Sequence, residues 1–220
     1  NAVPYLKSGK ARNLSTTQHT PSIQKADFAI FDHLFKNIFE TSSAKFILKD
    51  HQNKIALLDL EQYCFYLNHD VTEINFDALS LDIASLNHVV HFRKNMNPQD
   101  LNQGLWNFVW EHMTFTDQTF NQNYLLKKWP QIKNFENRKD IFKLAAIFSE
   151  GSNIEYAKVQ LKMSEKYIQQ FLCVSKLAGI LEEISTAQVK YKLSQHTTTP
   201  DTNQNSMISF FSKLRKKLGI

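Results

Sequence analysis

The chain has 220 residues, and 42% of them are hydrophobic, which is enough to build one large domain or two small ones with cores of their own. Its apolar runs are short and broken by charged residues, so none approaches the ~20 residues that a membrane-spanning helix needs. The formal net charge is +5, which makes the chain basic without showing where the charge lies.

The positive charge is concentrated at the two ends of the sequence. Residues 1–25 contain four bases and no acid, and residues 207–220 again contain four bases and no acid. Residues 26–136, by contrast, contain nine bases and fourteen acids. A protein that coats nucleic acid spreads Lys and Arg over a folded face. The distribution therefore predicts basic docking ends on a mildly acidic body.

Glycine and cysteine usage excludes several chemistries. The five glycines are scattered, so neither a phosphate-binding loop nor a dinucleotide fingerprint can be assembled, and no G-x-S-x-G elbow is present. Cys64 and Cys173 are too few for a disulfide framework and wrongly spaced for a metal knuckle. No apolar signal segment occurs in the first 25 residues. We expect a cytoplasmic protein without catalytic activity or cofactor.

The first elements in chain order are an arm, a helix and a sheet. Residues 1–21 are polar, basic and without periodicity, which predicts a flexible arm. An apolar stripe at helical spacing predicts a helix from about Ser22 to the break at 41–43; its members are Ile23, Phe28, Phe31, Leu34, Phe35 and Ile38. The segments KFILKD, KIALLDL and QYCFYL predict a three-stranded antiparallel meander. Residues 70–95 fit either strands or short helices.

A second helix is predicted at 98–113, with Asn97 as its cap and Pro98 at its first position. Trp106 and Trp110 flank its apolar face, and Trp129 precedes Pro130 at an expected domain boundary. If these three tryptophans form a partly exposed cluster, they mark a ligand groove or partner site.

The region 137–193 carries the most specific pattern. Apolar residues at helical spacing predict helices at about 141–148, 153–162 and 165–178, the last capped by Ser164. After Gly179, ILEEI and QVKYKL predict a hairpin. This order resembles a winged-helix or helix-turn-helix domain, whose pattern is met by Ala157, Leu161, Met163, Ser164 and Ile168. Lys158 and Lys162 depart from it, because the family usually has a small residue and a Gly there.

The winged-helix resemblance implies DNA contacts from helix 165–178 and the wing. The residues at the matching positions are Lys166, Gln169, Gln170, Lys176, Lys190 and Lys192. Arg is absent from this helix, and Glu165 would face phosphate, so such binding would be weak and salt-sensitive. We therefore favour a packing or protein-docking module over a DNA reader.

The N-terminal half resembles the small α/β domains of bacterial signalling adaptors, such as the PATAN type, in its order of a long helix, a meander containing ALLDLEQYCFYL, and further helices. This resemblance implies regulatory interaction without catalysis. The predicted class is α+β: a small antiparallel sheet with flanking helices at 22–130, then the winged-helix-like domain at 137–193, a linker at 194–206 and a tail helix at 207–220.

His88 and His91 form an H-x-x-H pair, a spacing that could place both imidazoles on one helical face. A metal site would need further ligands from distant positions. Because histidines beside apolar residues are more often boundary residues, we expect no metal.

The tail reads SFFSKLRKKLGI, and its apolar residues fall at helical spacing between four bases. Its expected docking residues are Phe210, Phe211, Leu214 and Leu218 with Lys213, Arg215, Lys216 and Lys217. It could bind a partner groove, an anionic membrane, its own body or a second copy in a homodimer. The overall expectation is a regulatory adaptor with a protein partner, the alternatives being a DNA-binding regulator and a peripheral membrane protein.

Overall fold

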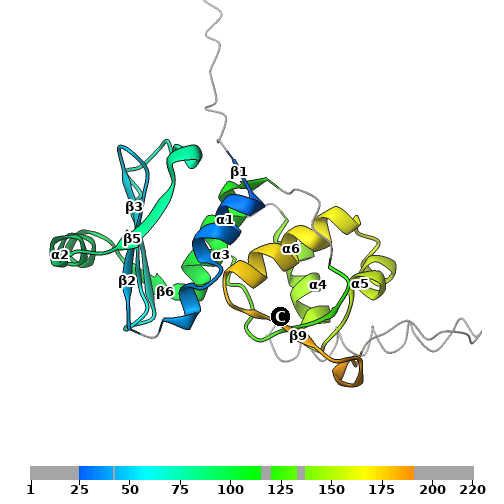
Figure 1. Cartoon of the computed structure of the whole chain (residues 1–220). Helices are drawn as coiled ribbons and strands as arrows, with labels where there is room; N and C mark the ends of the chain where they lie inside the picture. The colour runs from blue at the N-terminus through cyan, green and yellow to red at the C-terminus, as the bar shows by residue number, and fades with distance from the viewer. Residues whose placement is uncertain (1–24, 42, 115–119, 133–136, 191–220) are drawn as a thin grey trace, which may run out of the picture.

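The computed structural model describes residues 25–41, 43–114, 120–132 and 137–190, and Figure 1 shows their arrangement in successive layers. Helices cover both the outer and the inner face of a sheet, and a further helical group packs beyond the inner helices. The predicted arm at 1–21, the linker at 194–206 and the tail at 207–220 lie outside the described residues. Among the residues described, no helix has the length and apolarity to cross a bilayer.

The central sheet has the strand order β5-β2-β3-β4-β6. Strands β2 (Lys45–Lys49), β3 (Lys54–Asp59) and β4 (Cys64–Leu67) form the predicted antiparallel meander, which is confirmed. Side chains alternate between its two faces. Leu48, Leu58 and Phe65 enter the large core, whereas Ile47, Leu57 and Tyr66 form a small cluster on the opposite face.

Residues 70–95, which the sequence left open, contain both kinds of element. A 3₁₀ turn η2 (Phe76–Ala78) leads into the edge strand β5 (Ser80–Ile83), and helix α2 (Leu86–Asn95) follows. Ser85 caps α2 by accepting a hydrogen bond from the His88 amide. Val89 and Phe92 of α2 pack on the small cluster, so α2 covers the outer face of the sheet.

Helices α1 (Phe28–Phe35) and α3 (Leu101–His112) lie on the inner face. The predicted start of α1 near Ser22 is wrong. Residues Ala26–Asp27 form strand β1, which pairs in parallel with β7 (Met113–Thr114), so the helix begins at Phe28. The turn η1 (Ile38–Glu40) follows α1.

The predicted start of α3 is also wrong. Pro98–Asp100 form strand β6 on β4, and the helix begins at Leu101 with the Asp100 side chain accepting from the Gln103 amide. Pro fits an edge strand as well as a first helical turn, because neither position needs its missing N–H. The cap and the helix therefore lie three residues later than predicted.

Three helices follow: α4 (Arg138–Phe148), α5 (Ile154–Leu161) and α6 (Glu165–Leu177). We call them the helical unit. Their predicted positions are confirmed to within a few residues, and Ser164 caps α6 by accepting from the Tyr167 amide. Lys162 adopts a left-handed conformation, φ 54°, between α5 and α6.

The predicted hairpin after Gly179 is wrong within the described residues. Strand β9 (Leu181–Ile184) pairs with β8 (Asn123–Leu126), and residues Thr186–Gln188 form the 3₁₀ turn η3 instead of a strand. The Gln188 side chain returns to the Ser185 amide and closes that turn. Tyr124 of β8 also bridges to Ser152, between α4 and α5. A strand from the first predicted domain thus completes the sheet of the helical unit.

One hydrophobic core runs from the inner face of the sheet through α1 and α3 into the helical unit. Its fully buried members include Phe31 of α1, Phe65 of β4, Phe108 of α3 and Phe171 of α6. Rings of Phe31 and Phe108 meet edge to face at 6.2 Å between centroids, and Trp106 meets Phe171 at 6.4 Å. The layer of α1 and α3 therefore joins the sheet to the helical unit.

Candidate functional site

Helix α6 holds four of the six residues that the sequence predicted to contact DNA, so its surroundings decide what they can do. Lys166 and Lys176 are exposed, and Gln169 and Gln170 are half-buried in the first two turns. The Gln169 amide donates to Glu165 Oε1 at 3.2 Å, while Lys158 Nζ lies 2.9 Å from Glu165 Oε2. Glu165 therefore holds Gln169, one of the predicted contacts, and Lys158 of α5.

The middle of α6 is enclosed. All residues from 171 to 175 are buried, and Lys176 is the next exposed position. Cys173 follows Lys166, Gln169 and Gln170 on the outer face, yet it is fully buried. Helix α1 contacts α6 and brings the charge of Asp32 near this thiol. Burial raises the pKa of Cys173 to about 12, so the thiol is neutral and unreactive in the fold.

Two polar contacts fix α6 to α3 inside the core. Trp106 Nε1 donates to Ser175 Oγ at 3.2 Å, and Asn102 Nδ2 donates to the Ala178 carbonyl at 2.6 Å. Tyr63 in turn donates its hydroxyl to Asn102 Oδ1 at 2.8 Å. Buried hydrogen bonds of this kind set the register of two packed elements, because breaking one leaves a polar group without a partner.

The wing residues do not extend the α6 surface. Lys190 Nζ lies 2.5 Å from Glu150 Oε2, and Lys192 lies outside the described residues. In Figure 1, α6 begins on the upper side of the helical unit and η3, next to Lys190, lies on the lower side. The structure therefore does not gather the predicted DNA contacts into one free basic face.

The three tryptophans do not form an exposed groove, which corrects the prediction for Trp106. Trp106 is fully buried and stacks on Trp110 at 5.0 Å between centroids. Trp110 is half-buried and meets the Tyr167 ring edge to face at 5.8 Å. Trp129 is half-buried elsewhere, against Phe142. Trp106 and Trp110 thus pack α3 against α6.

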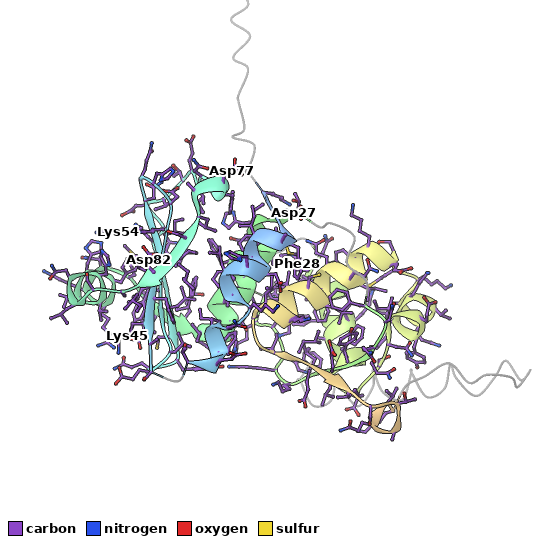
Figure 2. All side chains as sticks on the ribbon, viewed as in Figure 1. Asp27, Phe28, Lys45, Lys54, Asp77 and Asp82 are labelled. Atoms are coloured by element: carbon purple, nitrogen blue, oxygen red, sulfur yellow. The ribbon has the colours of Figure 1, made fainter. Side chains whose placement is uncertain are left out.

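Sequence reasoning missed the free edge of the sheet. β5 is the terminal strand, and Figure 2 shows Asp82 on it at the front of the molecule. Beside it lies a groove of about 460 Å³. Its apolar lining comes from Leu34 and Ile38 on the helical side and from Phe46, Leu79 and Leu81 on the sheet side. Its polar lining is His33, Asn37 and Ser80. Ile83, at the end of β5, is 80% exposed. The alternation in LSLDI, residues 79–83, was the available signal.

The histidine pair lies on α2. His91 is exposed and its Nδ1 lies 3.2 Å from Asn95 Nδ2, whereas His88 is half-buried and its pKa is lowered by burial and by nearby lysines. Within the described ranges, no three His, Cys, Asp or Glu side chains gather as metal ligands would.

No protein-family model matches this chain, and neither the curated proteins nor the solved structures contain a significant match to it.

Proposed function

We propose that this protein is a non-enzymatic regulatory or signalling adaptor that works through protein–protein contacts, with the helical unit as a packing and docking module. The burial of residues 171–175 of α6, which include Cys173 on its outer face, carries the proposal. A recognition helix needs its outer face free to enter a major groove ~12 Å wide. Here α1 covers that face at Cys173, so entry into a groove requires α1 to leave the core.

Charge supports the same function. Glu165 lies at the start of α6 and already pairs with Lys158, and Lys190 pairs with Glu150. A bound duplex would bring phosphates toward those carboxylates. Few lysines remain to release counterions, so DNA affinity would be low and nonspecific. The domain that resembles a winged helix is thus better suited to contacts with protein.

DNA titration tests this proposal. Fluorescence anisotropy with labelled duplexes of random sequence, between about 50 and 200 mM salt, should give only weak binding, with Kd near 10⁻⁴ M at the higher salt. Gln169→Ala should change nothing, and Lys166→Glu should have no more effect than Lys139→Glu, a matched charge reversal on the exposed surface of α4. Nanomolar binding that is lost in Lys166→Glu and Gln169→Ala, but kept in Lys139→Glu, would contradict the adaptor function.

The basic tail is proposed as the adaptor's docking peptide, because its apolar residues fall at helical spacing between four bases. The test is affinity capture with the full chain, using a triple variant Phe211→Ser, Leu214→Ser and Leu218→Ser that retains all four bases. We expect the variant to lose a partner that the parent binds. An identical partner set for both proteins would remove the tail from the mechanism. Loss of vesicle binding alone would favour the membrane alternative.

A further inference from the structure

Strand β5 is at the edge of the five-stranded sheet and pairs there with β2 alone among the described strands. We propose that strand β5 forms an antiparallel pair with β5 of a second copy of this chain, giving a symmetric dimer with one continuous sheet. This inference stands apart from the adaptor function, since it concerns the opposite end of the molecule from the helical unit.

The backbone of β5 presents unpaired groups to the outside. In an antiparallel pair, alternate residues direct both N–H and C=O toward the neighbouring strand. The Ala84 amide donates to the Lys45 carbonyl, so Ala84, Asp82 and Ser80 face β2 while Leu81 and Ile83 face away from it. No hydrogen bond joins the outward groups of Leu81 and Ile83 to any residue that the structure describes. Such an edge is a template for another strand.

Side-chain complementarity selects one register. Residues directly opposite each other in an antiparallel pair share a face of the sheet. With Leu81 opposite Leu81 of the second copy, Leu79 lies opposite Ile83, and Ser80 lies opposite Asp82. Apolar residues then meet apolar residues, and a hydroxyl meets a carboxylate. Centring the pair on Asp82 would instead oppose two carboxylates, which is unfavourable.

The same register pairs three of the four outward backbone groups of Leu81 and Ile83, and the Ile83 carbonyl stays open to water. The two Leu81 residues exchange both hydrogen bonds, and each Ile83 amide donates to the Leu79 carbonyl of the second copy. The Leu79 amide needs no partner there, because it already donates to the Phe76 carbonyl. The backbone hydrogen bonds and the side-chain pairs therefore select the same register.

The groove gives the pair its apolar contact. Ile83 lies opposite Phe46 in the β2–β5 register, so both are on the inner face of the sheet, where Leu79 lines the groove. In the dimer, Ile83 of each copy comes beside Leu79 of the other and enters that copy's groove. The contact is reciprocal, as a twofold interface requires. It explains why an isoleucine that is 80% exposed lies on a strand edge beside an apolar groove.

The expected affinity is modest. A five-residue edge buries less than the ~1,600 Å² of a standard interface, so we expect Kd between about 10 and 1,000 µM. Sedimentation velocity of the full chain over this range of concentration should show a monomer–dimer equilibrium.

Two substitutions locate the interface. Ile83→Lys should weaken dimerisation by about a hundredfold, because it places a charge in the groove and changes an exposed side chain that the monomer does not need. Val90→Lys is the matched control, since Val90 is 56% exposed on nearby α2, and it should leave Kd unchanged. A chain that stays monomeric over the whole range overturns the proposal, and so does a dimer lost in Val90→Lys but kept in Ile83→Lys.

Amide exchange by NMR then tests the pairing itself. The Leu81 and Ile83 amides should exchange rapidly in dilute solution and become protected as the dimer forms, while the Asp82 amide is protected at both concentrations. A dimer that leaves the Leu81 and Ile83 amides unprotected would overturn the strand pairing. DNA binding and tail-dependent capture report on the adaptor function separately, so either proposal can fail alone.

Discussion

The Trp106 indole donates a hydrogen bond to the Ser175 hydroxyl across 3.2 Å, and both side chains are fully excluded from solvent. This bond joins α3, which packs on the sheet, to α6 of the helical unit. In this position residues 171–175 of α6 are buried, including Cys173 on its outer face, and Lys176 is exposed. The position of α6 therefore links the fold to the proposed function.

The joint between α3 and α6 should be sensitive to loss of this bond. Ser175→Ala removes a buried hydrogen bond and should lower the free energy of unfolding by about 1 to 2 kcal/mol, measured by urea denaturation. Lys176→Ala, at the adjacent exposed position, is the control and should change stability by less than about 0.5 kcal/mol. Equal effects of the two substitutions would show that the bond contributes little.

The continuous core predicts cooperative unfolding of the sheet and the helical unit. Phe31 meets Phe108, and Trp106 on the same helix as Phe108 meets Phe171, all within one core, so neither part keeps its core when the other unfolds. Tryptophan fluorescence and far-ultraviolet circular dichroism should therefore give coincident transitions in urea. Two separated transitions would show that the parts fold independently.

Gly104 allows the close approach of α3 to β4. A Cβ built at Gly104 would lie 2.6 Å from Phe65 Cβ, closer than packed carbons approach. Gly104→Ala should therefore destabilise the protein by about 1 to 3 kcal/mol, although alanine favours the helix by about 1 kcal/mol. Thermal or urea unfolding measures the change. A more stable variant would mean that Phe65 can move aside without cost.

The two left-handed positions beside α6 should respond in opposite directions. Lys162→Gly should raise the free energy of unfolding by about 0.5 to 1 kcal/mol, because the lysine Cβ is sterically strained at φ 54° and glycine has no Cβ. Gly179→Ala should lower it by about 1 to 3 kcal/mol, because Gly179 has φ 70° and an added Cβ would lie 2.8 Å from Phe39 Cε2. Urea unfolding of both variants provides the comparison, and changes of the same sign would refute the conformational explanation.

His112 should make stability depend on pH. Burial, and then the charge of Lys25, lower the pKa of His112 in the folded protein, where its ring packs against Phe76 and Phe108. As pH falls through the unfolded value near 6.5, the unfolded chain binds a proton that the folded chain resists, so stability falls. His112→Phe should lose less stability between about pH 7.5 and 5.5 than the parent does. Parallel stability profiles for the two proteins would exclude this role of His112.

Local signals predicted much of the fold. The meander from Lys45 to Leu67 and the Ser164 cap depend on alternation and capping within a few residues, and both are present. Pro98 misled the prediction, because its fixed φ suits a helix start and an edge strand equally. The pairing of β9 with β8 joins segments more than fifty residues apart, which local patterns do not encode.

The candidate site was less predictable than the fold. Lys166, Gln169 and Lys176 were correctly placed on α6, but whether its outer face is free depends on α1, a segment more than a hundred residues earlier. The position of Trp106 beside the apolar face of its helix fits a tryptophan in a surface groove, and it fits equally a tryptophan buried in a helix that packs on two sides. Only the layer order distinguishes these two cases.

The closure of α6 can be tested most directly through the Cys173 thiol. In a Cys64→Ser variant, Cys173 is the remaining cysteine, and it lies on the α6 face that carries the predicted contacts Lys166, Gln169 and Gln170. Its labelling by a thiol reagent, followed across urea concentrations, gives the free energy of the opening that exposes it. We predict that this value equals the global free energy of unfolding and does not change when duplex DNA is added. If the opening that exposes Cys173 has a free energy several kcal/mol below that of global unfolding, the outer face of α6 is not closed in the folded protein. Faster labelling with DNA present would contradict the closure in the same way.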